Sequence, residues 1–308
     1  MELVNPTNAN GSAAVAPSSV PEEITPEDEA RFLSVVSTEL DDEQKKRILE
    51  PSETFPREHD LLAVHWHPEF IPMDLISRRI EATFPNAHNS LIIPTQHNEM
   101  LSYGDYSGVE VDCFASGFNQ KVQLLIHLRK EREGRADVLK SMLSYTFKYR
   151  SSQLFDFIDT IIKPNEQRLE AAARETGADA DLINFVQVHV RKVNDLLERH
   201  FDSIPPLMVK NKVLRNYFDT LRDTYGDPLI YRVQMFLKAV KMLVKAEFPL
   251  QYFYRASEVI EEARSIGACI VVPHPEQFWP ILLADYDVDG YEVWNPQSRK
   301  YTEFLISV

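Results

Sequence analysis

The sequence predicts an α/β fold that is interrupted by a large helical insertion. Short apolar runs typical of buried strands alternate with segments whose apolar residues recur at helical spacing. Alternation of this kind predicts parallel strands joined by helices. Between Lys130 and about Ala256 the helical periodicity is continuous and is punctuated only by proline and glycine, which indicates an insertion of helices alone.

The chain divides into five parts on composition and pattern. Thr25 is placed to cap a helix whose first residue is Pro26, so the ordered structure is expected to begin there. From the N-terminus the parts are a disordered tail rich in Asn, Pro, Ala and Ser (1–24), an N-terminal helical segment (25–58), the first half of the α/β region (59–130), the helical insertion (131–255) and the second half of the α/β region (256–308).

Within these parts, strands and helices follow from the period of the apolar residues. Strands are expected at 61–67, 90–94, 108–113, 122–126, 268–273 and 290–296. Helices outside the insertion are expected at 25–40, 41–47, 73–84, 257–266, 278–283 and 301–308.

Composition excludes several classes of function. The 308 residues carry a net charge of −14, which argues against general nucleic-acid binding because that requires a basic face. Cys113 and Cys269 are the only cysteines, so there is no disulfide framework and a reducing cytoplasm is expected. No apolar run approaches the roughly 18 residues that a membrane span needs.

The stretch Leu61–Glu69 carries the first chemical signal. Its apolar run ends in His65 and His67, and side chains two residues apart in a strand point to the same face. A neutral imidazole is the commonest side-chain metal ligand, so this pair could supply two ligands to one site. Two structural histidines at a surface strand end are the alternative.

Further ligand types stand at the other strands. Glu110 lies inside a β-branched strand, and histidines lie at or just after the apolar runs of the remaining strands. The candidate metal ligands are His65, His67, His97, Glu110, His127 and His274. A mixed nitrogen and oxygen set suits zinc, manganese or iron, and a carboxylate such as Glu110 can bridge two ions. His189, by contrast, lies on the apolar stripe of a helix and is expected to be a core residue.

The order of these motifs resembles the PHP (polymerase and histidinol phosphatase) superfamily. The resemblance covers about residues 60–130 and 256–308. Six segments carry it: Val64–His67 is similar to the opening His-x-His strand, Pro94–Asn98 to the Thr-Asp-His-Asp segment, Gly108–Val111 to the Gly-x-Glu strand, Ile126–Leu128 to the next ligand strand, Gly267–Pro275 to the segment ending Ala-His-Pro, and Asp289–Pro296 to the Asp-Gly-Ile-Glu-Val-Tyr-Asn segment.

The resemblance implies a distorted (β/α)7 TIM-like barrel and a metal-dependent phosphoesterase with two or three divalent ions. It implies that Glu110, His127 and His274 serve one ion, that His65, His67 and Glu110 serve a second, and that His97 belongs to a third. These roles come from the resemblance alone.

The sequence also departs from the family pattern. Gln96 replaces the usual Asp, and Pro68 and Glu69 replace small polar residues. A further ligand expected after the first motif has no clean match, and Asp74 is the nearest candidate. The closing Asp-x-His motif does not occur before Val308, so the sequence is expected to be a fragment or to lack part of its site.

Three functions therefore remain open. The first is a phosphoesterase that uses a metal-activated water on a small-molecule phosphate ester, with Arg129 and Lys130 as candidate phosphate contacts. The second is a metal-dependent amide or ring hydrolase. The third is a degenerate barrel that acts as a binding or regulatory module. The helical insertion could cap the barrel mouth, or it could serve packing or formation of a homo-oligomer.

Overall fold

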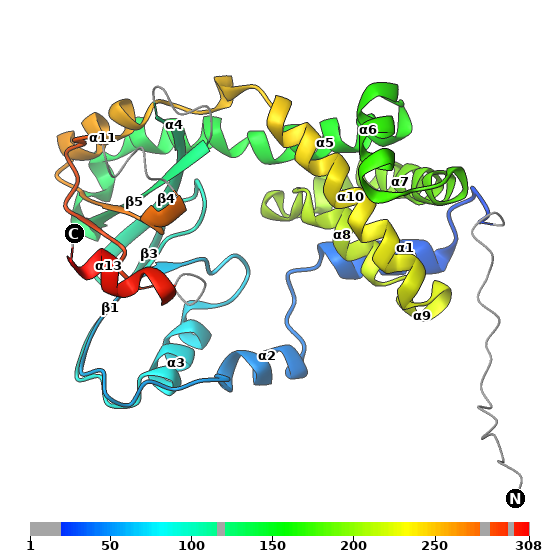
Figure 1. Cartoon of the computed structure of the whole chain (residues 1–308). Coiled ribbons are helices and arrows are strands. Elements are labelled where there is room, and N and C mark those ends of the chain that lie inside the picture. The colour runs from blue at the N-terminus through cyan, green and yellow to red at the C-terminus, as the bar shows by residue number, and fades with distance from the viewer. Residues whose placement is uncertain (1–19, 116–120, 278–283, 295–298, 308) are drawn as a thin grey trace, which may run out of the picture. The chain divides into compact units, whose positions relative to one another are not determined.

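The computed structural model describes residues 20–115, 121–277, 284–294 and 299–307 (Figure 1). These residues form two compact units. One contains the described residues up to Thr38 together with Arg150–Phe248, and the other contains Glu39–Tyr149 with the described residues from Pro249 onward. The predicted helix at 278–283 and most of the predicted tail lie outside the described residues.

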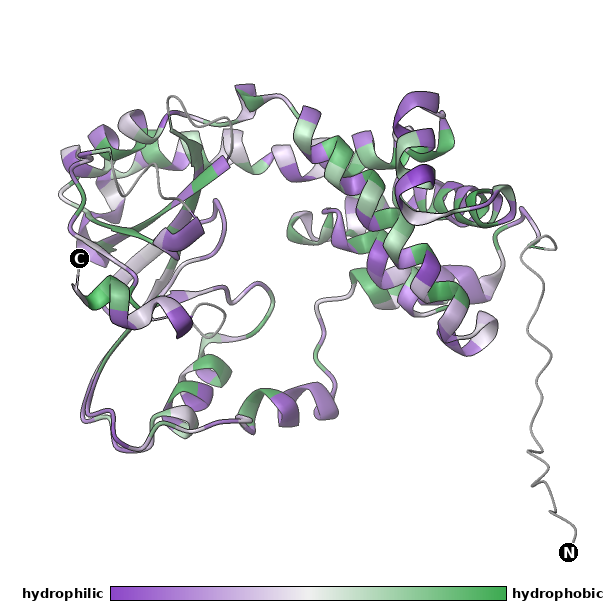
Figure 2. Cartoon of the chain, viewed as in Figure 1, coloured by the Kyte–Doolittle hydropathy of each residue, from purple (hydrophilic) through white to green (hydrophobic). Residues whose placement is uncertain are grey.

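The first unit is built from helices, which show alternating hydrophilic and hydrophobic residues in Figure 2. They are α1 (Pro26–Val36), α5 (Tyr149–Ile162), α6 (Glu166–Thr176), α7 (Ala180–His200), α8 (Lys212–Asp219), α9 (Arg222–Tyr225) and α10 (Asp227–Glu247), with short 3-10 turns η3 (Phe201–Ser203) and η4 (Pro206–Met208). The predicted N-cap is confirmed, because the Thr25 side chain accepts a hydrogen bond from the Asp28 backbone N–H.

Buried polar groups tie α1 to its neighbours within this unit. Asp28 turns inward, where its carboxylate accepts from Lys192 Nζ at 2.8 Å and from the Tyr217 hydroxyl at 3.1 Å. His189 on α7 is buried among aromatic rings, and neither ring nitrogen has a hydrogen-bond partner among the described residues. The prediction that His189 is a core residue is therefore confirmed.

The burial of His189 predicts a pH-dependent stability. Burial, and then the nearby Lys192 charge, lowers the pKa of His189 to about 4. The unfolded chain therefore binds more protons than the folded chain between pH 6.5 and 4, so stability is complete above pH 6.5 and falls as the pH drops to 4. Leucine does not titrate, so between pH 6.5 and 4 we expect the free energy of unfolding of His189→Leu to fall by up to about 3 kcal/mol less than that of wild type. Urea unfolding at pH 4, 5, 6 and 7 measures it, and parallel pH profiles for both proteins would contradict it.

The second unit contains two sheets and the helices that cover them. A parallel pair joins β1 (Asp60–Trp66) to β2 (Asn89–Pro94), and a five-stranded sheet has the order β3 (Leu101–Tyr103), β4 (Tyr106–Phe114), β5 (Lys121–Arg129), β6 (Cys269–Val272), β7 (Gly290–Tyr291). The helices are α2 (Asp42–Leu49), α3 (Met73–Thr83), α4 (Asp137–Phe147), α11 (Ala256–Ser265) and α13 (Thr302–Ser307), and the 3-10 turns are η2 (Lys130–Arg135), η5 (Leu250–Tyr252), η6 (Pro275–Gln277) and η7 (Arg299–Tyr301).

The α/β class is confirmed, but the expected strand directions are only partly correct. β1 and β2 are parallel with α3 as their crossover, and β6 pairs with β7 in parallel. The prediction is wrong for β4, β5 and β6, whose successive pairs are antiparallel, and β3, which the sequence did not predict, is also antiparallel to β4. Residues 115–120, which join β4 to β5, are too few for the crossover that a parallel pair requires. The described strands close no barrel, so the (β/α)7 barrel stays a prediction.

The two faces of the β4–β5 pair have opposite characters. One face carries alternating apolar residues that pack against α4 and α11 in the main core of this unit. These residues include Val109, Val111 and Cys113 on β4 and Leu124 and Ile126 on β5. The other face carries Glu110, Asp112, Gln123 and His127, all of them buried. This buried polar face is where the candidate site forms.

Gly108 lets β2 approach this polar face closely. A Cβ at this position would overlap the Pro94 carbonyl oxygen and the Ile93 side chain, so a larger residue would push β2 away from β4. The glycine of the Gly-x-Glu segment therefore serves close packing between the two sheets, and it brings the end of β2 to within reach of Glu110.

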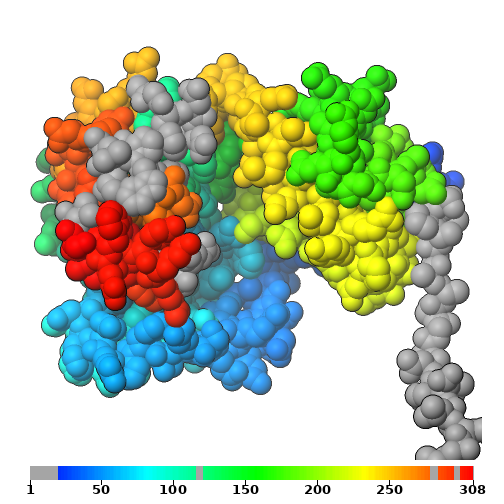
Figure 3. Space-filling model, viewed as in Figure 1, coloured from blue at the N-terminus to red at the C-terminus, as the bar shows by residue number. Residues whose placement is uncertain are grey.

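Two further findings concern the surface. α13 lies on the viewed face in Figure 3, and its Phe304 and Ile306 side chains are exposed. Among the described helices, none combines the length and the apolar character that crossing a membrane requires. The domain boundaries suggested by the sequence stay predictions. Helix α4 packs on the five-stranded sheet, although it lies within the segment that was expected to form the insertion.

Candidate metal centre

The buried carboxylate of Glu110 is the centre of the site. The side chain is fully buried on β4, and its Oε2 lies 3.2 Å from His65 Nε2 and 3.0 Å from His67 Nε2. The two imidazoles come from the end of β1 and its immediate continuation. Because the backbone there is extended, the side chains two residues apart reach the same carboxylate oxygen, as the sequence pattern predicts.

His97 approaches the other oxygen of the same carboxylate. Its Nδ1 lies 3.2 Å from Glu110 Oε1, and its ring stacks on that of His67 with centroids 4.3 Å apart. The loop after β2 is held against β4 by backbone hydrogen bonds, in which the Asn98 N–H donates to the Glu110 carbonyl and the Glu110 N–H donates to the Gln96 carbonyl. Glu110 and His97 are therefore positioned by the same local backbone pairing.

A buried polar network supports this loop. Asn98 adopts a left-handed backbone with φ 53°, which asparagine tolerates better than most residues. Its side chain donates to Asp112 Oδ2 at 2.6 Å and accepts from the Asp112 backbone N–H at 2.9 Å. Lys121 pairs with the same carboxylate, and Gln123 Nε2 lies 3.1 Å from Asp112 Oδ1 and 3.4 Å from His97 Nδ1.

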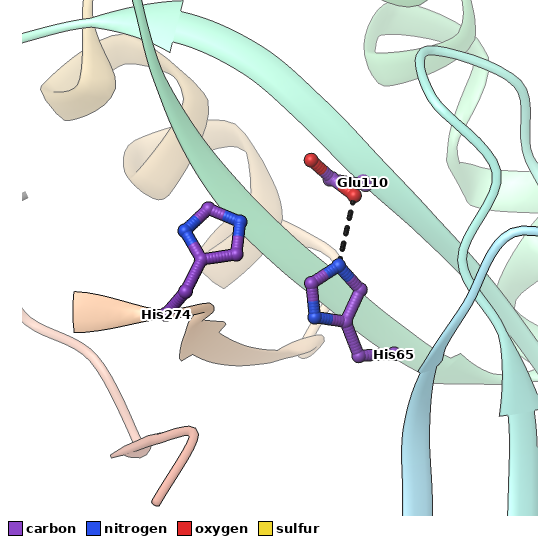
Figure 4. Close-up of side chains that lie close together, drawn as sticks. All are labelled: His65, Glu110 and His274. Carbon is purple, nitrogen blue, oxygen red and sulfur yellow. Dashed lines mark hydrogen bonds and ion pairs between the residues drawn. The ribbon is translucent and has the colours of Figure 1, made fainter. Parts of the chain in front are cut away.

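A fourth histidine near Glu110 comes from a distant part of the sequence. His274 follows β6, and its ring centroid lies 5.5 Å from that of His65 (Figure 4). Glu292 follows β7, which pairs with β6 in parallel. One oxygen of Glu292 lies 2.9 Å from His65 Nδ1, and the other accepts the His274 backbone N–H at 2.7 Å.

Two groups of possible ligands result, and they share one residue. The first is His65, Glu110 and His274, and the second is His67, His97 and Glu110, with the ligand atoms of each group within 4.8 Å of one another. Imidazole nitrogens with a carboxylate fit a divalent transition metal. In addition, the buried Nδ1 of His67 has no hydrogen-bond partner among the described residues. The residues present therefore fit a metal.

The hydrogen bonds around Glu110 keep its carboxyl group ionised, which is the form that can bind a metal. Burial raises the pKa of Glu110, but hydrogen bonds from His65, His67 and His97 outweigh it and hold this pKa well below its usual range. Burial lowers the pKa of His65, yet the two carboxylates on either side of the ring raise it overall to about 9. Burial lowers the pKa of His67 and of His274, so both favour the neutral imidazole that a metal requires.

Three of the predicted site residues lie apart from these two groups. His127 is on the polar face of β5, but its Nε2 lies 3.2 Å from the Val64 carbonyl oxygen, and burial lowers its pKa to about 4. Arg129 lies over the Tyr106 ring, with Cζ 5.6 Å from the centroid, and Lys130 is exposed at the start of η2. Arg129 is four residues along β5 from Leu125, which pairs with Glu110, a distance of about 13 Å along the strand.

The expected set is therefore brought together only in part. Four of the five candidate histidines gather around Glu110, whereas His127 faces a backbone carbonyl and Asp74 is exposed on α3. The roles of Arg129 and Lys130 stay predictions. Sequence reasoning missed Glu292 and Asp112 as members of the site. Glu292 lies within the segment Asp289–Pro296, which resembles a family motif, and Asp112 is two residues from Glu110 on the same strand face. Both positions could therefore have been recognised from the sequence.

No family model matches the chain, and no curated protein matches its sequence. A solved structure from Bifidobacterium adolescentis, of a presumed metal-dependent phosphoesterase, is 14% identical, with 82% of this chain and 85% of that chain covered at a TM-score of 0.39.

Proposed function

We propose that the protein is a divalent metal-dependent hydrolase and, more specifically, a phosphoesterase that acts on a small-molecule phosphate ester. The observation that carries this proposal is the position of Glu110, which belongs to both groups of possible ligands. Its Oε2 contacts His65 of the first group and His67 of the second, and its Oε1 contacts His97 of the second. A carboxylate shared in this way can bridge two ions. The order of the ligand motifs along the chain, which resembles the PHP superfamily, agrees with this proposal.

Each residue has a defined task in this proposal. His65, His274 and Glu110 would hold one ion, and His67, His97 and Glu110 would hold a second. Bound ions would supply an activated water and a positive charge that stabilises the developing charge on a phosphoryl group. The four histidines would bind as neutral ligands, so they would leave that positive charge largely uncompensated. Glu292 contacts His65 on one side, and Gln123 of the Asp112 network contacts His97 on the other.

Hydrolysis of an aryl phosphate tests the proposal. Purified protein is stripped with a chelator and resupplied with zinc, manganese or iron, and hydrolysis of p-nitrophenyl phosphate is followed. We expect metal-dependent turnover that is lost in the His65→Ala, His67→Ala double variant. His59→Ala serves as a control, because His59 is an exposed histidine of the same unit.

The competing functions give different outcomes in the same experiment. Turnover of carboxamides or lactones without turnover of phosphate esters would indicate an amide or ring hydrolase instead. Absence of both metal uptake and turnover, with a partner bound equally well by the wild type and the double variant, would indicate a binding or regulatory module. Either result would overturn the phosphoesterase proposal.

A further inference from the structure

Glu292 contacts the candidate ligands but is not one of them. It lies outside both groups of candidate ligands, and yet its carboxylate contacts one member of the first group through a side chain and another through the backbone. It is partly buried, and the bond from the His274 N–H, at 2.7 Å, has the length typical of a strong hydrogen bond to a carboxylate. A residue that contacts two candidate ligands at once is suited to orient them.

The contact with His65 distinguishes the two ring nitrogens. Glu292 Oε1 lies 2.9 Å from Nδ1, while Nε2 points to Glu110 (Figure 4 shows this second contact). Histidines that bind metals typically donate the other ring N–H to a carboxylate or carbonyl, which fixes both the tautomer and the ring orientation. The Glu292 contact therefore reserves Nδ1 for a hydrogen bond and leaves Nε2 directed toward the site.

The contact with His274 acts on the backbone. His274 has φ 32°, in the left-handed region that costs free energy for a residue with a side chain. Its N–H donates to Glu292 Oε2, so the same carboxylate that orients the His65 ring also holds the turn that carries His274. β6 and β7 run in parallel, which places the turn after β6 beside Glu292, just beyond the end of β7.

From these contacts we infer that Glu292 is a positioning residue of the metal centre, which sets His65 and His274 together for one ion. This inference rests on the proposed metal-dependent function. Removal of such an outer partner typically costs 10- to 100-fold in metal affinity. Glutamine at position 292 could accept only one of the two hydrogen bonds, because its amide nitrogen cannot accept, so its effect should lie between those of wild type and alanine.

Cobalt binding to full-length protein tests the inference. We expect Glu292→Ala to bind Co²⁺ about 10- to 100-fold more weakly than wild type, and Glu292→Gln to fall in between. At saturating Co²⁺, the visible absorption spectrum of the alanine variant should differ from that of wild type, because the His65 ring is no longer held. A merely structural role would lower thermal stability without changing this spectrum. Glu261→Gln, an exposed glutamate on α11, is the matched control.

A second readout needs no metal. Exchange of the His274 backbone amide is measured by NMR on metal-free protein labelled with ¹⁵N-histidine, and it should be about tenfold or more faster in Glu292→Ala. Normal Co²⁺ affinity and an unchanged spectrum in that variant would overturn the inference and leave the proposed function standing. Wild-type protein that takes up no Co²⁺ would overturn the proposed function. The positioning of His274 would then be judged by amide exchange, and an unchanged rate would overturn it.

Discussion

Glu110→Gln should abolish tight metal binding at both groups of ligands. Glutamine keeps the size of the side chain but removes the charge and one acceptor oxygen, and Glu110 is the one residue that the two groups share. Loss of an outer-shell partner costs about 10- to 100-fold in metal affinity, so loss of this shared ligand should cost more than about 100-fold. Competition with a chelating dye measures the affinity, and aryl phosphatase activity should fall in parallel.

The control for this variant is Glu99→Gln. Glu99 lies in the same loop region but is exposed and belongs to neither group of ligands. It should bind metal as the wild type does. A Glu110→Gln protein that is folded and retains the wild-type affinity would show that the carboxylate is not a ligand.

Asp112→Ala should destabilise the second unit and disturb His97. The carboxylate is fully buried, and it accepts hydrogen bonds from Asn98, Gln123 and Lys121. Its removal leaves the Lys121 ammonium without its anion and releases the left-handed Asn98. Breaking a fully buried pair costs about 3–5 kcal/mol, and because the Lys121 side chain is 33% exposed we expect a loss near the lower end, about 3 kcal/mol. Urea unfolding measures the loss, and metal affinity should also fall because His97 contacts Gln123.

A double variant separates the charge effect from the loss of packing. Adding Lys121→Met to Asp112→Ala removes the uncompensated cation, so it should restore part of the lost stability, whereas Lys121→Met alone should destabilise. Burial raises the pKa of Asp112 but the Lys121 charge lowers it overall, so this pair contributes stability above the unfolded pKa of the carboxyl, and that stability is lost as the pH falls. A single Asp112→Ala variant within about 0.5 kcal/mol of wild type would contradict this account.

Much of the candidate metal centre could be predicted because strand periodicity is simple. His65 and His67 share a face through the alternation of an extended chain, and both contact Glu110 Oε2. Glu110 could be singled out as a carboxylate within an apolar strand, since a buried charge needs partners. The N-cap at Thr25 and the core position of His189 also follow from local pattern alone.

Other features depend on contacts that local pattern does not contain. The sequence places His127 at a strand end, but which way its ring nitrogen points depends on β1, whose Val64 carbonyl lies beside it. Glu292 contacts His65 across 227 positions of sequence, so only the pairing of β6 with β7 and their approach to β1 reveals its role. The antiparallel pairing of β4 with β5 departs from the rule that alternating strands and helices form parallel sheets, because the six residues between the two strands are too few for a parallel crossover.

Anomalous diffraction from crystals grown with Zn²⁺ tests the central claim most directly. The account predicts a zinc peak within bonding distance of the Glu110 carboxylate, about 2.0–2.2 Å, with His65 and His274 or His67 and His97 as the nitrogen ligands. A map from fully loaded crystals with no zinc peak in contact with Glu110, or with zinc bound only at other residues, would contradict it.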